Sequence, residues 1–233
     1  MPPTPVAIII PALNEEQSIG CVLDAIPPDL RAEVVVVDNG STDGTAAVAS
    51  SRGARVISEP RRGYGAACLA GIASLGLPEV VVFLDADFSD DSSLLPELTK
   101  PILEGRADLV IGSRMLGERE PGALPLHARF GNWLAGRILT HLYRQRTTDL
   151  GPFRAIRWET LRRLDMRDCG FGWTMEMQAK AARLKARLLE VPVPYRKRIG
   201  RSKITGSLIA SLRAGATILF TAFRLLRWRP TTL

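Results

Sequence analysis

The sequence predicts an α/β fold with a mainly parallel sheet flanked by helices, and the order of apolar and helical segments carries this prediction. Short apolar runs alternate with stretches of helical length, and Gly53 and Gly105 close two of these stretches, at 43–51 and 92–103. The expected strands cover Ala7–Ile10, Val34–Val37, Arg55–Ile57, Val80–Leu84 and Leu109–Ile111. Such alternation requires right-handed crossovers, which place helices on both faces of the sheet.

The composition is that of a globular protein with an excess of positive charge. The 233 residues are 46% hydrophobic and 24% charged, enough for one full core with or without an appendage. The net charge of +7 indicates an anionic partner such as a phosphorylated substrate, a membrane surface or a nucleic acid. Basic residues gather from Arg106 onward without the interleaved aromatic residues that stack on nucleic-acid bases, so we expect no nucleic acid.

The remaining composition favours a cytoplasmic protein without a membrane-spanning segment. The three cysteines are widely spaced and form no CxxC pair, which is typical of free thiols in a reducing compartment. The apolar run at residues 6–10 is too short for a signal peptide and is better interpreted as the first strand. Arg213 and Arg224 interrupt the only apolar stretch near the C-terminus that approaches the length of about 18 residues that a spanning helix needs.

Asp85-Ala86-Asp87 follows directly after the strand expected at Val80–Leu84. The two carboxylates therefore lie at the carboxyl end of a buried strand, where ligands bind in open α/β sheets. Hard oxygen ligands suit Mg²⁺ or Mn²⁺, and an ion held by one or two carboxylates completes its shell with substrate phosphates. On its own such a pair is more typical of a solvated turn or a helix cap than of a metal site.

Polar or glycine-containing loops follow the first four expected strands, and these loops meet at one edge if the strands are parallel. The loops are Pro11–Glu16, Asp38–Ser41, Glu59–Gly63 and Asp85–Asp87. Carboxylates, glycines and two arginines in one cleft suit a metal-bound nucleotide, because arginine counters phosphate charge. Gly63-Tyr64-Gly65 does not fit the dinucleotide-binding fingerprint and is more typical of a structural turn.

Together these motifs, with Val37–Thr45 and Gly112-Ser113-Arg114, resemble the family-2 glycosyltransferases of the GT-A (Rossmann-like) fold. The resemblance runs from Val6 to Thr205 and is greatest to the dolichyl-phosphate mannose synthase and polyprenyl-phosphate glycosyltransferase branch. It implies an inverting, metal-dependent transfer of a hexose from a nucleotide diphospho-sugar, of the GDP-mannose or UDP-glucose type, to a polyprenyl or dolichyl phosphate. The reaction would take place on the cytoplasmic face of the membrane.

The resemblance also implies roles for individual residues. The donor would contact Pro11, Leu13, Asn14, Glu15, Asp38, Arg62, Gly63, Asp85, Ala86 and Asp87. The metal, Mg²⁺ or Mn²⁺, would be held by Asp85, Asp87 and Ser89, with Asp90 and Asp91 as neighbouring alternatives. The acceptor phosphate would contact Arg114, Arg129, Asn132 and Lys203. The catalytic residues would be Asp87, Asp149 and Arg114.

Asp149 has two possible roles at this point. In relatives with hydroxyl acceptors an aspartate of this region acts as general base, whereas a phosphate acceptor is already an anion and needs none. Asp149 would then orient Arg154 or the acceptor. Two further functions stay open: a glycosyltransferase that acts on a soluble hydroxyl acceptor with Asp149 as base, and a non-catalytic, membrane-associated nucleotide-binding protein.

The chain divides into an expected catalytic domain at 1–203 and an amphipathic C-terminal helix at 204–233. Arg213, Arg224 and Arg227 fall on one side of this helix, and Leu208, Ile218 and Leu225 are among the apolar residues opposite. This pattern favours a helix in the interface of an anionic membrane, with a packed core or dimer helix as the alternative.

A second helical stretch at 133–143 has apolar pairs beside arginines. The basic loop at 196–203 is expected to cover donor or acceptor phosphate, or to attract the membrane. Nothing in the sequence indicates an oligomeric state.

Overall fold

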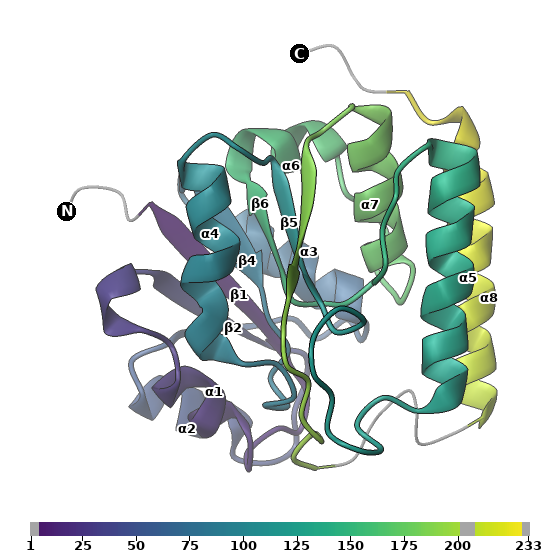
Figure 1. Cartoon of the computed structure of the whole chain (residues 1–233). Helices are drawn as coiled ribbons and strands as arrows, with labels where there is room; N and C mark the ends of the chain where they lie inside the picture. The colour runs from purple at the N-terminus through teal and green to yellow at the C-terminus, as the bar shows by residue number, and fades with distance from the viewer. Residues whose placement is uncertain (1–4, 201–207, 230–233) are drawn as a thin grey trace.

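The computed structural model describes residues 5–200 and 208–229, which form a mixed, mostly parallel sheet flanked by helices (Figure 1). The sheet has seven strands in the order β3-β2-β1-β4-β6-β5-β7. The strands are β1 (Val6–Ala12), β2 (Glu33–Asp38), β3 (Arg55–Ser58), β4 (Val80–Phe83), β5 (Leu109–Ser113), β6 (Arg154–Arg157) and β7 (Leu188–Pro192). All five strands expected from the sequence are confirmed, and β6 and β7 are additions to them.

The first four strands are parallel to one another, so their carboxyl ends share one edge of the sheet. β1 pairs with β2 and β4, and β2 pairs with β3, all in parallel register. β6 is antiparallel to both β4 and β5, while β5 and β7 are parallel. The sheet is therefore parallel on both sides of one inverted strand.

Helices cover both faces of the sheet, as the alternation of segments predicts. The helices are α1 (Ile19–Asp24), α2 (Thr45–Ser51), α3 (Tyr64–Ser74), α4 (Leu95–Leu103), α5 (Leu126–Tyr143), α6 (Trp158–Leu164), α7 (Trp173–Arg183) and α8 (Leu208–Arg224), with 3-10 turns η1 (Pro28–Leu30), η2 (Ser92–Leu94) and η3 (Leu225–Arg227). Ile8 and Ile10 of β1 point into the core with α1, α2 and α4, and Ile9 points into the core with α3, α6 and α7. This opposite orientation of successive side chains follows from the pleat of the strand.

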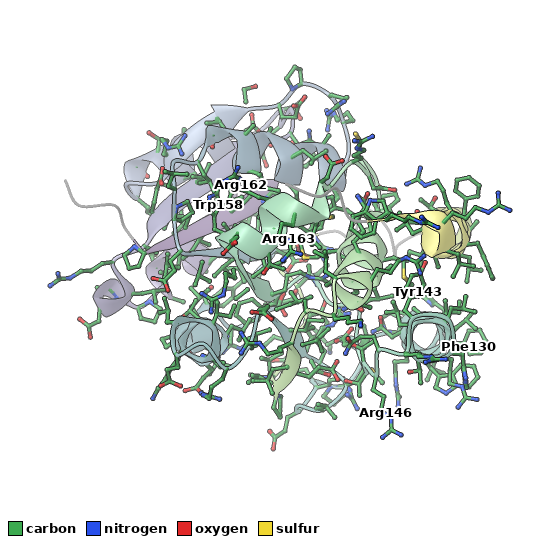
Figure 2. The ribbon with its side chains drawn as sticks, turned by 90° about the horizontal axis from the view of Figure 1, so that it is seen from above. Phe130, Tyr143, Arg146, Trp158, Arg162 and Arg163 are labelled. Carbon is green, nitrogen blue, oxygen red and sulfur yellow. The ribbon has the colours of Figure 1, made fainter. Side chains whose placement is uncertain are left out.

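α5 and α8 lie side by side as an outer layer beyond α7 (Figure 1). Tyr143 of α5 lies between the two helices, and its hydroxyl donates a hydrogen bond to the carbonyl oxygen of Ala222 (Figure 2). Leu225 is buried in the same cluster, and Ile218 packs against it. Much of the apolar side that the sequence pattern assigns to a membrane interface is thus in contact with α5 and α7. In the part of the chain that the structure describes, no helix is long and apolar enough to cross a membrane.

Candidate active site at the carboxyl edge of the sheet

A cleft of about 370 Å³ opens where β1, β2 and β4 end, and we refer to it as the donor cleft. It is lined by Pro11, Ala12, Leu13, Glu15, Asn39, Arg62, Gly63, Tyr64, Ala67, Asp85, Ala86, Asp87, Phe171 and Arg198. Eight of the ten residues expected to contact the donor are in this lining, all except Asn14 and Asp38. The convergence of the four loops is confirmed because the strands that precede them are parallel.

Asn14 and Asp38 connect the loops that follow β1 and β2. The Asn14 side-chain oxygen accepts the Thr42 backbone N–H at 2.8 Å, and the Asn14 N–H donates to the Ser41 hydroxyl at 3.0 Å. An Asp38 carboxylate oxygen accepts the Ser41 N–H at 2.9 Å. These bonds fix the two loops against each other, and the contacts of both residues with a donor stay a prediction.

Asn39, which the sequence analysis did not assign to the site, holds the loop that presents Arg62. Its amide nitrogen donates to the carbonyl oxygens of Glu59 and Arg61, each at 2.8 Å. Its amide oxygen accepts the Gly63 N–H at 2.9 Å. The side chain is buried, so these three bonds also satisfy its polar atoms where water has little access.

Gly63 and Gly65 allow the N-terminus of α3 to approach the loop at 168–171. A Cβ atom on Gly63 would lie 2.2 Å from the Cys169 carbonyl oxygen, and one on Gly65 would lie 2.0 Å from that of Asp168. Gly63 also has a φ of +144°, which strains any other residue. The same loop brings Phe171, with 38% of its surface exposed, into the lining of the donor cleft. The glycines therefore serve a structural turn that shapes the cleft.

Asp85, Asp87 and Ser89 form the candidate metal site. Asp87 Oδ1 accepts the Ser89 N–H at 2.9 Å and the Ser89 hydroxyl at 2.5 Å. Asp85 Oδ1 is buried and has no hydrogen-bond partner among the residues that the structure describes. Burial and the nearby Asp87 charge raise the pKa of Asp85 to about 7. The described residues contain no group of three acidic, His or Cys side chains that would enclose a metal. Two carboxylates and a hydroxyl instead fit a divalent cation whose shell is completed by a diphosphate.

Arg198 places a positive charge beside these carboxylates. Its Nη2 atom lies 3.1 Å from Asp87 Oδ2 and 3.1 Å from Glu15 Oε1. The loop that carries it crosses the metal site, where the Ile199 N–H donates to the Asp87 carbonyl oxygen at 3.0 Å and the Arg196 N–H to that of Ser89 at 2.9 Å. The sequence predicts that this basic loop covers donor or acceptor phosphate or attracts the membrane, without singling out Arg198, and the fold makes Arg198 part of the donor cleft.

Asp90 and Asp91, the alternatives for the metal, have other surroundings. Asp91 forms an ion pair with Arg196 at 2.6 Å. Asp90 is buried, and neither carboxylate oxygen has a hydrogen-bond partner within the described residues. Burial, and then the charge of Asp85, raise the pKa of Asp90 well above its ordinary value.

Arg114 and Asp149 form a buried, bidentate ion pair. Arg114 Nε lies 2.8 Å from Asp149 Oδ2, Nη2 lies 2.6 Å from Oδ1, and the Arg114 backbone N–H donates to Oδ2 at 2.8 Å. Burial lowers the pKa of Arg114, but the adjacent carboxylate outweighs it and leaves the pKa well above its ordinary value. Asp149 thus orients Arg114, whereas Arg154 donates to the carbonyl oxygens of Leu150 and Gly151.

The other residues expected at the acceptor phosphate are Arg129, Asn132 and Lys203. Arg129 is exposed on the first turn of α5, and Asn132 is buried one turn later. Within the described residues, neither forms a hydrogen bond or ion pair with Arg114. Lys203 lies outside the described residues. The structure therefore brings together Arg114 and Asp149, and the joint role of the four residues stays a prediction.

Comparison with known proteins identifies relatives over most of the chain. The model of the family described as glycosyl transferase family 2 matches residues 7–170. An undecaprenyl-phosphate mannosyltransferase of Micrococcus luteus is 32% identical over 230 residues, which cover 91% of this chain and 92% of the relative. A dolichyl-phosphate hexose transferase of Haloferax volcanii is 36% identical over 201 residues, which cover 85% and 86%.

A solved structure with the same fold is that of glucosyl-3-phosphoglycerate synthase from Mycobacterium tuberculosis in complex with Mn²⁺, uridine diphosphate and phosphoglyceric acid. It superposes with a TM-score of 0.76 and 25% sequence identity, over 97% of this chain and 80% of the other. In the present chain, the order of the strands and the loops at the carboxyl edge of the sheet agree with the GT-A architecture expected from the sequence. The chain belongs to glycosyl transferase family 2 and is a glycosyltransferase with the GT-A fold.

Proposed function

We propose that this glycosyltransferase transfers a hexose from a nucleotide diphospho-sugar to a polyprenyl phosphate with inversion at the anomeric carbon. The observation that carries the proposal is the buried Arg114–Asp149 pair beside the donor cleft. Arg114 is close enough to Asp85 for its charge to lower the pKa of that carboxyl. Asp149 binds the Nε and Nη2 edge of the guanidinium, while Nη1 makes no hydrogen bond within the described residues. The remaining edge of the guanidinium, which carries Nη1, suits the oxygen atoms of a phosphate.

The donor cleft supports the nucleotide half of the proposal. Pro11, Leu13 and Glu15 would contact the base and ribose, while Arg62 and Arg198 would counter the diphosphate charge. Mg²⁺ or Mn²⁺ bound by Asp85, Asp87 and Ser89 would act as a Lewis acid on the departing diphosphate. The related synthase binds Mn²⁺ and uridine diphosphate, which supports this choice of ion and ligand class.

The proposed reaction requires no removal of a proton from the acceptor. An acceptor phosphate oxygen forms a bond to the anomeric carbon while the bond from that carbon to the diphosphate oxygen breaks. Because the acceptor is an anion at neutral pH, Arg114 would hold it in line and Asp149 would hold Arg114. This assigns Asp149 an orienting role, and Asp87 and Arg114 the contacts with metal and substrate.

The outer helices support a site of action at an anionic membrane surface. On α5 the large apolar side chains of Leu126, Phe130 and Trp133 are exposed beside Arg129 and Arg137. Phe130 lies at the outer margin of the molecule in the view from above (Figure 2). On α8 and the segment after it, the exposed side chains include Phe220, Phe223, Arg224, Arg227 and Arg229. Aromatic and basic side chains together are typical of helices in the membrane interface.

The arrangement of the outer helices also supports a role in acceptor delivery. Both helices begin at the edge of the molecule where the parallel strands end (Figure 1). A lipid phosphate held at that edge would therefore reach Arg114 on the cytoplasmic face. The division into a catalytic domain at 1–203 and an interfacial helix at 204–233 stays part of this proposal.

A soluble phosphorylated acceptor is the second candidate. The related synthase is bound to phosphoglyceric acid, and a buried arginine fits a phosphate whether or not it is attached to a lipid. In that case a hydroxyl group attacks, and Asp149 would be available as base only if it released Arg114.

One experiment separates the two candidates. Purified protein is incubated with Mn²⁺ or Mg²⁺, a panel of sugar nucleotides, and either undecaprenyl phosphate or phosphoglyceric acid, and the product is identified by mass spectrometry. We expect a glycolipid that disappears with EDTA and in Asp87→Asn but persists in Asp24→Asn, which alters a surface ion pair with Arg52. Transfer to phosphoglyceric acid alone would refute the lipid acceptor.

A second experiment tests whether the protein binds a membrane surface. The protein is expected to float with anionic vesicles, and protein that stays at the bottom at low salt refutes membrane binding.

A further inference from the structure

Glu190 of β7 has a carboxylate whose hydrogen bonds, among the described residues, all go to the loop that carries Asp149. Its carboxylate accepts the Thr148 N–H at 2.8 and 3.0 Å, the Asp149 N–H at 3.2 Å, and the hydroxyls of Thr147 and Thr148 at 2.9 and 3.0 Å. In the described part of the chain no Lys or Arg forms an ion pair with it. Backbone and hydroxyl donors from three successive residues therefore solvate this partly buried charge.

The same loop is attached to the segment that presents Arg114. The Thr148 and Ser113 hydroxyls are 2.6 Å apart, and Ser113 is the last residue of β5, directly before Arg114. β7 pairs with β5 in parallel register, with Glu190 opposite Ile111. Glu190 thus stands on the strand beside the one that delivers Arg114, and it binds the loop that delivers Asp149.

We infer that Glu190 is a positioning residue for the acceptor phosphate. By fixing Thr148 and Asp149, it sets the Asp149 carboxylate at the distance where it binds the Nε and Nη2 edge of Arg114. The remaining guanidinium edge is then held in one orientation toward a phosphate monoester. Glu190 touches no substrate in this arrangement, and the inference rests on the proposed role of Arg114 at the acceptor.

A purely structural role for Glu190 predicts a different result. If the residue only stabilised the fold, its replacement would lower thermal stability and leave the kinetic constants of the folded enzyme unchanged. If it positions Arg114, its replacement raises KM for the acceptor or lowers kcat and leaves KM for the sugar nucleotide unchanged, because the donor cleft is formed by other loops.

The test compares Glu190→Gln with wild type and with Glu33→Gln. Gln keeps the size of the side chain but replaces one acceptor oxygen by a donor that faces the Thr148 and Asp149 N–H groups. Glu33 is a matched control, since it is a strand glutamate whose partner is Arg55, away from the cleft. Thr148→Val, which removes one hydroxyl from the network and keeps the backbone N–H, is the second variant in case Glu190→Gln does not fold.

We expect hydrogen exchange of the Thr148 and Asp149 amides to become about tenfold faster in Glu190→Gln, because each loses a charged acceptor. We expect kcat/KM for polyprenyl phosphate to fall by about 10-fold to 100-fold, the size typical of a small displacement of a binding group, with KM for the donor within about twofold. Equal changes for both substrates, or faster exchange with unchanged acceptor kinetics, would overturn the inference.

A binding measurement separates this inference from the proposed reaction. Calorimetry with a short-chain prenyl monophosphate needs no turnover, and we expect weaker binding by Glu190→Gln than by wild type and Glu33→Gln. A wild type that binds the phosphate but transfers no sugar refutes the proposed function alone. Equal affinity in all three proteins refutes the role of Glu190. No binding by wild type refutes the assignment of Arg114, and the inference with it.

Discussion

Arg198 forms an ion pair with Asp87 across the donor cleft, with 3.1 Å between the guanidinium Nη2 and Asp87 Oδ2. The same nitrogen atom contacts Glu15, so one cation satisfies two acids from different loops. Asp87 is also the proposed ligand of the divalent cation. A metal ion that binds Asp87 must therefore compete with Arg198 or move it toward the diphosphate.

Replacing Arg198 is expected to strengthen the binding of Mn²⁺ alone and to reduce sugar transfer. In Arg198→Met, Asp87 loses a partly exposed ionic partner, an interaction of about 1 kcal/mol or less, so Mn²⁺ alone binds up to about fivefold more tightly. Sugar transfer falls, because the diphosphate loses a counter-charge. Calorimetric titration with Mn²⁺ measures the first effect, and Arg196→Met is the control with the same change in charge and a different partner, Asp91. Unchanged or weaker Mn²⁺ binding by Arg198→Met would contradict the competition.

The pKa of Asp85 predicts how metal binding depends on pH. Burial and the adjacent Asp87 raise this pKa to about 7 in the protein without metal. The metal binds the ionised carboxyl, so protons compete with it below pH 7 and not above. We expect Mn²⁺ affinity to fall by up to about tenfold between pH 7 and pH 6 and to change little between pH 8 and pH 9. Titrations across this range test it, and Asp85→Asn, which cannot titrate, is expected to bind weakly with a flatter pH dependence.

Gly65 is expected to tolerate no side chain. A Cβ atom would lie 2.0 Å from the Asp168 carbonyl oxygen, and backbone must move to relieve that contact. We expect Gly65→Ala to lower the free energy of unfolding by about 1–3 kcal/mol and to raise KM for the donor, because the N-terminus of α3 and the loop with Phe171 both line the cleft. Gly76→Ala is the control, since no atom of the described residues lies within 4 Å of its Cβ position. Equal stability of the two variants in chemical denaturation would contradict the steric argument.

Sequence predicts β1 to β4 and their loops because each strand is a short apolar run and parallel order brings their ends together. β6 escapes such a prediction because it contains two arginines in four residues. Arg154 is nevertheless fully buried, and carbonyl oxygens of Leu150, Gly151 and Thr174 satisfy its guanidinium. No local pattern indicates that the residues just before β6 and the first turn of α7 supply these acceptors.

The residues of the candidate site also differ in how well the sequence predicts them. Asp85 and Asp87 are predictable because they follow a buried strand directly, whereas Arg198 enters the cleft from a loop that pairs with residues more than a hundred positions earlier. Glu190 is equally hidden, since one acid in a partly exposed edge strand resembles a solvated residue. The role proposed for Glu190 follows from the hydrogen bonds that the loop at 147–149 donates to its carboxylate, and the sequence alone does not indicate these bonds.

Asp149 is expected to act through Arg114 rather than as a base, and three variants distinguish these roles. Asp149→Asn leaves the buried guanidinium without a counter-charge, which costs about 3–5 kcal/mol of folding stability, and it also releases the orientation of Arg114. Transfer to a phosphate acceptor should fall by the same factor at every pH from 6 to 9, with a higher KM for the acceptor. If Asp149 were the base, residual transfer by this variant would rise with pH relative to wild type. Arg114→Lys keeps the charge but not the bidentate geometry and should lose acceptor affinity as well. The double variant Arg114→Met/Asp149→Leu removes both charges, so chemical denaturation should show stability recovered relative to Asp149→Asn while transfer stays absent.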